Sequence, residues 1–192
     1  MAELLSRGAV ARSPIAQPAP VVVRDGWEVS DRRSSAALTM ADCTPIPKWL
    51  VRGDSVFAVP FGRAERVGDA LVVGSGPAEW TVLGGRAPAP GGDFVSVIDV
   101  THGRAMIRLT GPLAASVLAK VCAINLADRV TPDGVAFRSS VAKLVTDVVR
   151  DDRDGTPSYL LHCERSSGQY LFEALLDAGA EFGIEPTATE TR

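Results

Sequence analysis

The sequence lacks a long apolar run and any strong excess of charge. Its longest apolar stretch, from Leu113 to Leu126, is interrupted by Lys120 and Asn125 and is shorter than the roughly 18–20 residues of a membrane span. Residues 1–20 hold no continuous apolar segment of about 7–15 residues, so we expect no signal peptide. With 20 Lys and Arg against 23 Asp and Glu, the formal net charge is −3, which argues against binding nucleic acid through a basic surface. We therefore expect no membrane and no nucleic acid among the partners.

Cysteine and histidine are scarce and scattered. The three cysteines, Cys43, Cys122 and Cys163, have no C-x-x-C spacing, and His102 and His162 are the two histidines. Zinc prefers clustered Cys and His ligands, so we assign no metal to this chain. Isolated cysteines are typical of a reduced, cytoplasmic protein without disulfides, and we expect that location.

Familiar catalytic signatures are missing as well. The sequence has no G-x-S-x-G elbow to pair a serine with a histidine. The Gly-Ser-Gly-Pro segment at residues 74–77 leads into a strand rather than the helix that a dinucleotide fingerprint requires. We expect His162 to be a structural residue within a strand, and His102 to make local hydrogen bonds in a bend near Asp99. We therefore assign no catalytic residue from these patterns.

The composition that remains is that of an ordinary globular protein, with 46% hydrophobic and 22% charged residues among 192. Residues 1–33 are rich in proline and polar residues, and we expect a flexible arm that is extended or disordered unless a partner orders it. Residues 34–184 are predicted to form a single domain, and residues 185–192 a C-terminal tail.

The predicted domain consists of two related halves. A Gly- and Pro-rich loop at residues 84–93 joins residues 34–84 to residues 94–184. Each half contains an Asp-x-Thr motif, then a polar kink and an apolar strand that ends in glycine, at residues 42–53 and 99–111. This repeat is weak evidence for an internal duplication.

Two helices are expected in the second half. Pro112 is at a plausible first position of one helix, whose apolar residues up to Val121 share a face. Another helix is expected to begin at Ser166, where Gln169 has the spacing of a capping box, and to end at Gly183.

The remaining apolar runs predict strands, and the longest of them is expected to bend at residues 139–140. The last strand is expected to return as its hairpin partner. Helices on one face of a mostly antiparallel sheet make an α+β fold. The predicted strands cover residues 94–100, 105–110, 135–149 and 159–163.

Several motifs, taken in their order along the chain, resemble a known family. They are Ser-Pro-Ile at residues 13–15, Gly-Pro-Ala-Glu-Trp at 76–80, Val-Ile-Asp-Val-Thr at 97–101, Leu-Thr-Gly-Pro at 109–112, and the helix that leads through Cys122 to Asn125-Leu126. Together they resemble the γ subunit of heterotetrameric sarcosine oxidase. The resemblance covers residues 36–184 and the short motif in the arm.

This resemblance implies the duplicated α+β architecture of the folate-binding aminomethyltransferase group, which includes the T-protein of the glycine cleavage system. It also implies partners: a large α subunit with NAD and a folate domain, a β subunit with FAD, an FMN held between α and β, and a small δ subunit with zinc. Such a complex oxidatively demethylates sarcosine or a related secondary amine and passes one-carbon units to tetrahydrofolate. The γ subunit carries no redox cofactor and contributes to assembly.

One position departs from the pattern of the full transferases. The resemblance places residues 158–163 on a strand whose Gly-Tyr-Glu signature supplies a glutamate that holds the pterin, and this chain has Leu160 at the glutamate position. A leucine accepts no hydrogen bond from a pterin. The resemblance therefore implies a non-catalytic accessory subunit of a sarcosine-oxidase-like flavoprotein complex.

Two alternatives stay open. A stand-alone folate or small-molecule binding protein, or a one-carbon transferase, would need a pocket, for which Asp99, His102, Arg104 and Glu164 are the candidate residues. The same residues could simply cap and pair across a bend. A homo-oligomeric scaffold without a ligand is the other alternative.

Overall fold

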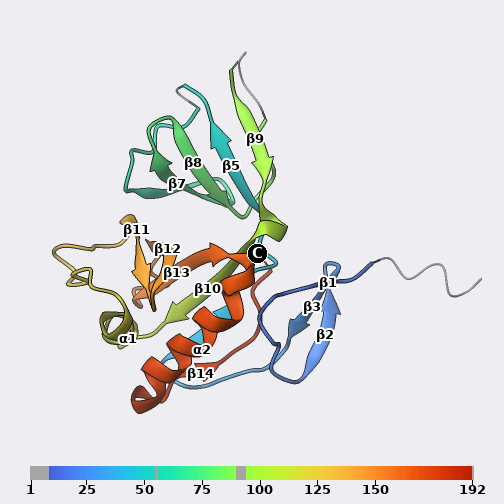
Figure 1. Cartoon of the computed structure of the whole chain (residues 1–192), viewed down its shortest axis with the longest axis vertical. Coiled ribbons are helices and arrows are strands. Elements are labelled where there is room, and N and C mark those ends of the chain that lie inside the picture. Colours follow the sequence, from blue (N-terminus) through green and yellow to red (C-terminus); the bar gives the residue numbers. More distant parts are fainter. Residues whose placement is uncertain (1–8, 55, 90–93, 192) are drawn as a thin grey trace, which may run out of the picture.

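A computed structural model describes residues 9–54, 56–89 and 94–191 of the chain. These residues form three β-sheets and two α-helices, with short 3₁₀ turns between them (Figure 1). None of the helices in these three ranges has the length and apolarity that crossing a bilayer requires. Parts of the predicted arm, loop and tail lie outside the described residues, namely residues 1–8, 90–93 and 192.

The central sheet has six strands and carries both helices on one face. Its strands pair antiparallel except at the short edge strand β14, which runs parallel to β4. In sheet order the strands are β11 (Ala136–Val141), β12 (Leu144–Arg150), β13 (Ser158–Glu164), β10 (Arg104–Thr110), β4 (Thr39–Asp42) and β14 (Glu185–Pro186). Helices α1 (Ala114–Val121) and α2 (Gly168–Gly179) pack on this sheet through one apolar core, to which Ile107, Leu161 and Leu171 contribute. The prediction of an α+β fold with helices on one face is confirmed.

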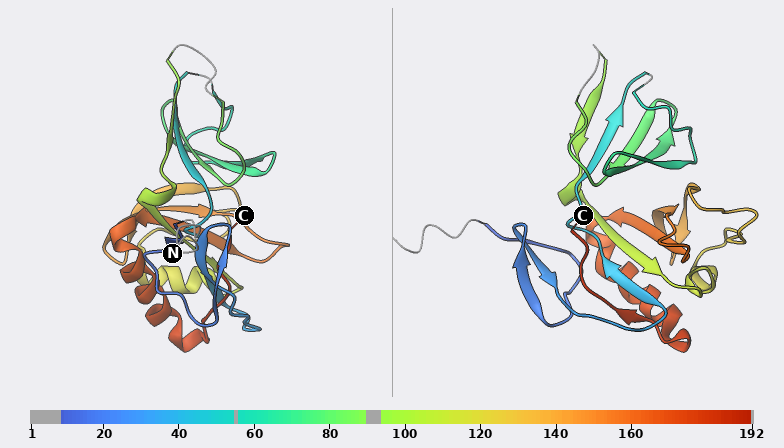
Figure 2. Two further views of the ribbon diagram at one scale, coloured as in Figure 1. Left: turned by 90° about the vertical axis from the view of Figure 1, so that its right-hand side faces the viewer. Right: turned by 180° about the vertical axis from the view of Figure 1, so that it is seen from behind.

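A second, five-stranded antiparallel sheet packs on the opposite face of the central sheet. Its strands, in order, are β6 (Ala64–Val67), β7 (Ala70–Gly76), β8 (Glu79–Leu83), β5 (Lys48–Arg52) and β9 (Ser96–Asp99). Met106 and Leu160 of the central sheet meet Leu71 and Leu83 in the core between the two sheets. The molecule is therefore layered as helices, central sheet and second sheet (Figure 2).

The two large sheets repeat one order of strands. β6-β7-β8-β5 in the second sheet corresponds to β11-β12-β13-β10 in the central sheet. Each sheet then gains one strand from the opposite half of the chain. Strand β4 comes just before β5 in the sequence but pairs with β10 in the central sheet. Strand β9 comes just before β10 but pairs with β5 in the second sheet. The two halves of the chain are thus interleaved, and neither builds its sheet alone. A common origin of the halves remains a prediction.

The two Asp-x-Thr motifs make equivalent hydrogen bonds at these crossings. The Asp42 carboxylate accepts from the Thr44 N–H at 2.8 Å, and the Thr44 hydroxyl accepts from the Met106 N–H at 3.2 Å. In the other half, the Asp99 carboxylate accepts from the Thr101 N–H at 2.8 Å, and the Thr101 hydroxyl accepts from the N–H of residue 48 at 2.9 Å. Each motif therefore ends one strand and fastens the start of the crossing segment to the neighbouring strand of the same sheet, to β10 in the first case and to β5 in the second.

The described part of the arm forms a third, small sheet in the order β1 (Ala11–Arg12), β3 (Trp27–Ser30) and β2 (Val21–Arg24). The chain itself orders this segment, because Ile15, Trp27 and Val29 become buried. The C-terminal segment helps, since the Thr189 hydroxyl donates to the Gln17 side chain at 2.6 Å. The N-terminal arm and the C-terminal segment are thereby held together by hydrogen bonds.

Two local predictions were wrong. The bend in the long β-branched stretch lies at Ala142 and Lys143, not at residues 139–140, because both residues adopt positive φ (48° and 68°) and form a two-residue hairpin turn. The α2 helix begins at Gly168 after a 3₁₀ turn, so the predicted capping box does not form. Its Gln169 side chain instead accepts a hydrogen bond from the Ala16 N–H of the arm at 2.6 Å.

Candidate functional site

A cleft between the central and second sheets is the candidate site. It contains two adjoining cavities, of about 360 Å³ and about 410 Å³. Arg138, Asp147 and His162 line both cavities, and the smaller one is also lined by Arg104 and Glu164. The cleft thus gathers acidic, basic and imidazole side chains in one place.

Strand register brings these side chains together. Arg138 on β11, Asp147 on β12 and His162 on β13 lie directly opposite one another. Arg104 and Glu164 face each other at the adjoining ends of β10 and β13. Because successive residues of a strand point to opposite faces, these side chains face the second sheet while their neighbours enter the core under the helices.

The charges in the cleft neutralise one another. Arg104 donates to the Asp147 carboxylate at 2.6 Å and to the Glu164 carboxylate at 2.5 Å. Arg138 donates to both oxygens of Asp147, at 2.6 and 3.2 Å. The Asp147 carboxylate therefore has two guanidinium partners, and its lone pairs are largely used within the protein.

His162 is neutral in this setting. It is 4% exposed, and its Nδ1 lies 3.5 Å from the Asp147 carboxylate and 3.4 Å from an Arg104 nitrogen. Burial lowers the pKa of His162 from 6.5 to about 4, and the opposing effect of Asp147 is too small to restore it because Arg104 and Arg138 neutralise that carboxylate. An imidazole with a pKa of about 4 is a weak base and is almost entirely unprotonated near neutral pH. His162 is therefore a weak base in this cleft.

Lys48 is the buried cation in the wall of the smaller cavity. Its ammonium donates to the carbonyl oxygens of Thr44 and Ile46, at 2.7 and 2.8 Å. Burial lowers the pKa of Lys48 to about 8. Both acceptors belong to the turn between β4 and β5, so this side chain stabilises the crossing between the sheets.

Of the four residues proposed from the sequence as pocket residues, the structure places Arg104 and Glu164 in the cleft. Asp99 instead accepts hydrogen bonds from Thr101, which lower the pKa of that carboxyl. His102 stacks on Trp27, with 4.8 Å between ring centroids and an interplanar angle of 9°. Its ring thus fastens the arm to the 3₁₀ turn before β10.

Sequence reasoning missed Arg138 and Asp147. The available signal was an aspartate at position 147 inside the otherwise apolar and β-branched strand 144–149. Such a residue needs a partner when it is buried, and the partner is Arg138 on the neighbouring strand.

The cysteines take no part in this site. All three are free and buried, and burial raises the pKa of Cys163 to about 11, so its thiolate does not form near neutral pH. Within residues 9–54, 56–89 and 94–191, no three His, Cys, Asp or Glu side chains are grouped to hold a metal ion.

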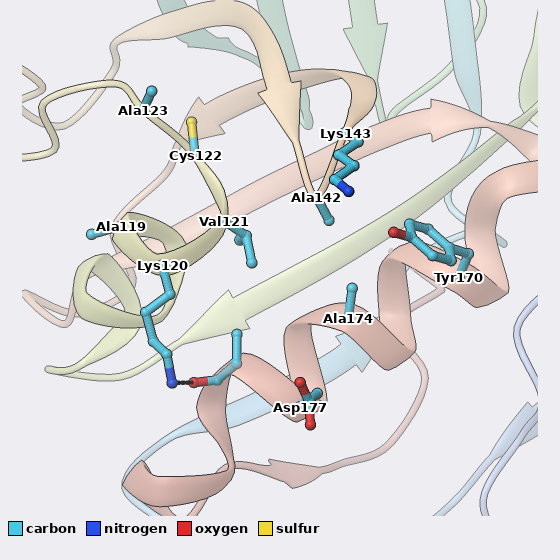
Figure 3. A pocket seen from close by; sticks show the side chains of 11 residues that line it. Ala119, Lys120, Val121, Cys122, Ala123, Ala142, Lys143, Tyr170, Ala174 and Asp177 are labelled. Carbon is cyan, nitrogen blue, oxygen red and sulfur yellow. Dashed lines mark hydrogen bonds between the residues drawn. The ribbon is translucent and has the colours of Figure 1, made fainter.

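A groove of about 650 Å³ lies on the helical side of the molecule, between α1, the turn at residues 142–143 and α2 (Figure 3). Alanine is the commonest residue in its walls, which also include Tyr170 and Asp177 from α2. Lys120 closes one end by donating to the Ala178 carbonyl and the Glu181 carboxylate, both at 2.7 Å. The groove is larger than either cavity of the cleft but brings together no comparable set of acidic and basic groups.

Three comparisons with known proteins bear on this fold. Residues 71–192 match the family model of the GCVT N-terminal domain. Among curated proteins, the chain is 33% identical over 98 residues to an aminomethyltransferase of Geobacillus thermodenitrificans (strain NG80-2), which covers 51% of this chain and 27% of that protein. It is 30% identical over 100 residues to an aminomethyltransferase of Anoxybacillus flavithermus (strain DSM 21510 / WK1), with coverages of 51% and 27%. The chain thus spans about a quarter of the length of these relatives.

Two solved structures share the fold. A chain of the heterotetrameric sarcosine oxidase from Corynebacterium sp. U-96, in complex with pyrrole 2-carboxylate, matches with a TM-score of 0.68 and 21% identity, over 81% of this chain and 90% of that chain. The glycine cleavage system aminomethyltransferase T from Bartonella henselae matches with a TM-score of 0.69 and 13% identity, over 93% of this chain and 60% of that chain.

Proposed function

Because the chain belongs to the family of the GCVT N-terminal domain, we propose that it is a non-catalytic, γ-type accessory subunit of a sarcosine-oxidase-like flavoprotein complex. The observation that carries this proposal is the mutual neutralisation of the charged groups in the cleft. Asp147 is held by two arginines, and His162 is a weak base with a pKa of about 4, so neither is suited to general base catalysis near neutral pH. The likeness to a chain of a heterotetrameric sarcosine oxidase supports membership in a multi-subunit complex.

The cleft also fails to fit tetrahydrofolate. Leu160, at the position where the resemblance would place a pterin-binding glutamate, is buried in the apolar core between the sheets. The nearby carboxylates of Asp147 and Glu164 already accept hydrogen bonds from Arg104. The Asp147 carboxylate, with two guanidinium partners, has little acceptor capacity left for a pterin edge, so we derive no step through folate on this chain.

In the proposed complex, the chemistry belongs to the partner subunits. The N-methyl group of sarcosine or a related secondary amine is oxidised by two electrons, dioxygen takes up these electrons as hydrogen peroxide, and the one-carbon unit passes to tetrahydrofolate. FAD, FMN, NAD and tetrahydrofolate would be bound by α- and β-type subunits, and zinc by a δ-type subunit. The complex would be cytoplasmic, and this chain would shape and stabilise it.

The first test is a gentle purification of the affinity-tagged full chain from its native host. We expect larger chains to co-elute, with the visible absorption bands of flavin, and native mass spectrometry to count each subunit. An identically tagged unrelated protein from the same host controls for carry-over. A colourless eluate that contains this chain alone would contradict the proposal.

A stand-alone small-molecule binder remains the second candidate, because the cleft offers a cavity of about 360 Å³ beside the partly exposed Arg138. We expect calorimetry of the isolated chain with tetrahydrofolate to show no binding heat, since Leu160 and the paired Asp147 offer the pterin no free acceptor. Micromolar binding that disappears in Arg138→Met would favour this second function instead.

A further inference from the structure

The outer strand of the arm sheet, β2 (Val21–Arg24), is an open edge. All four of its residues are exposed, and Val21 retains 48% of its surface. Because neighbouring side chains of a strand point to opposite faces, three successive valines leave both faces of β2 apolar. Within the described residues β2 pairs with β3 alone, so its second row of backbone N–H and C=O groups faces outward.

This edge is more apolar than the edges formed by β6, β11 and β14. Natural edge strands are blunted by charged residues, by proline or by very short length. Edge strand β6 carries Glu65 and Arg66, β11 carries Arg138, and β14 is two residues long and contains Pro186. On β2 three successive exposed valines precede its one charged residue, Arg24, and such an apolar edge favours a partner that covers it in the working assembly.

The edge is also held rigid, as a docking strand should be. A tight turn at Asp25 and Gly26, both with positive φ (52° and 78°), joins β2 to β3. Buried Trp27 anchors β3 to the body and stacks on His102, while the Ser30 N–H donates to the Thr189 hydroxyl at 2.9 Å. A strand that is already ordered loses little entropy when a partner adds to it.

The charges around β2 favour an acidic incoming segment, and the small size of the edge argues against a second copy of this chain. Asp31 donates its N–H to the Pro20 carbonyl, so the exposed Arg32 and Arg33 that follow lie at the Val21 end of β2. Arg24 is paired with Asp31 of its own chain at 3.1 Å, so the positive charge open to a partner is that of Arg32 and Arg33. Four residues of edge also bury far less than the roughly 1,200–2,000 Å² of a stable interface.

A larger partner would find more open surface on the same side of the molecule. β9, the open edge of the second sheet, lies there with Ile98 exposed (Figure 1). The stack of His102 on Trp27 joins the arm to the turn that directly follows β9. The open edges of β2 and β9 thus lie on the same side of the molecule.

We propose that β2 receives an extended segment of another subunit, which adds a strand to the arm sheet and carries apolar side chains and at least one carboxylate that pairs with Arg32 or Arg33. Backbone hydrogen bonds to the free edge and valine contacts on both faces hold the segment. This inference rests on the proposed membership in a multi-subunit complex and names the surface through which this chain joins it.

The test compares Val21→Glu with Val67→Glu in the tagged full chain, purified gently from the native host. Both valines lie on edge strands and are 48% exposed, so both variants should fold equally well, which circular dichroism checks. We expect Val21→Glu to lower the yield of co-eluting subunits at least tenfold, because its carboxylate repels an acidic segment and competes for Arg32 and Arg33. Val67→Glu should leave the yield unchanged.

Arg32→Glu combined with Arg33→Glu provides a second variant that leaves the valine edge intact, and it should also reduce co-elution. If wild type recovers partner chains and both the Val21 variant and the arginine variant recover them equally, the docking inference is overturned while the proposed function stands. If wild type recovers none, the proposed function itself fails. If sedimentation shows a wild-type dimer that Val21→Glu converts to monomer, a second copy covers β2 and the inference is likewise overturned.

Discussion

Replacing Arg108 by methionine is expected to lower the free energy of unfolding by about 3 kcal/mol at neutral pH. The Arg108 side chain is 4% exposed and donates to the Asp151 carboxylate and the Ser158 hydroxyl, both at 2.9 Å, and to Glu190 at 3.1 Å. Methionine fills most of the same space but leaves Asp151 buried without its inner partner. Arg66, at 2.7 Å from Asp151, keeps the loss from being larger.

The matched control is Arg153→Met. Arg153 approaches the same two carboxylates, at 3.5 Å from Asp151 and 3.7 Å from Glu190, but is 44% exposed. Exposed pairs of this kind contribute at most about 1 kcal/mol, so the control should remain close to wild type in urea unfolding. Equal losses in both variants would contradict the assignment of the stability to the buried pair.

The pH dependence separates charge from packing in this experiment. Burial alone would raise the pKa of Asp151, but the guanidinium groups of Arg108 and Arg66 more than offset it and hold the pKa below its ordinary value. Ionised Asp151 therefore adds stability above its unfolded pKa of about 3.9, and this contribution is lost as the pH falls through the folded value. The deficit of Arg108→Met should shrink as the pH approaches about 3. A constant deficit would indicate lost packing alone.

The Arg108→Met substitution is also expected to affect the small sheet of the arm. Glu190, which Arg108 binds, follows Thr189, whose hydroxyl joins Gln17 and Ser30. Loosening the C-terminal segment should therefore loosen the sheet that presents β2. The buried ion pair in the central sheet and the open edge of the arm are connected by three consecutive contacts.

Helices and individual strands could be predicted from the sequence because local patterns determine them. The period of Leu171, Leu175 and Ala178 matches one face of α2, and the left-handed Gly183 ends that helical region as predicted. The strands around residues 101–104 also follow directly from alternating apolar residues. These features depend on near neighbours in the chain.

The candidate site could not be predicted in the same way, because it depends on register and on distant pairing. With a turn at residues 139–140, as the sequence suggested, Arg138 would not face Asp147. The real turn uses Ala142 and Lys143 at positive φ, where neither residue type signals such a conformation. The exchange of β4 and β9 between the sheets likewise has no local signal, yet it creates the cleft and places Lys48 in its wall.

Stability is expected to fall by roughly 3 kcal/mol between pH 6.5 and pH 4 because of His162 alone. The folded protein holds this imidazole neutral, with a pKa of about 4 against an ordinary 6.5, so between these values the unfolded chain binds more protons than the folded one. The contribution of neutral His162 to the free energy of unfolding is therefore complete above pH 6.5 and is lost as the pH drops towards 4. In His162→Gln, urea unfolding at pH 7 and at pH 4.5 should show a clearly smaller difference than wild type.

His102→Gln is the matched histidine substitution outside the cleft, since His102 is exposed and stacks on Trp27. An NMR titration of the His162 imidazole measures its pKa in the folded protein directly and should show a value near 4. A value near 7 would mean that the cleft holds a working base beside Asp147, and the case for a non-catalytic subunit would fall with it. A value near 4 would mean that His162 is not a general base near neutral pH, as the proposed accessory role requires.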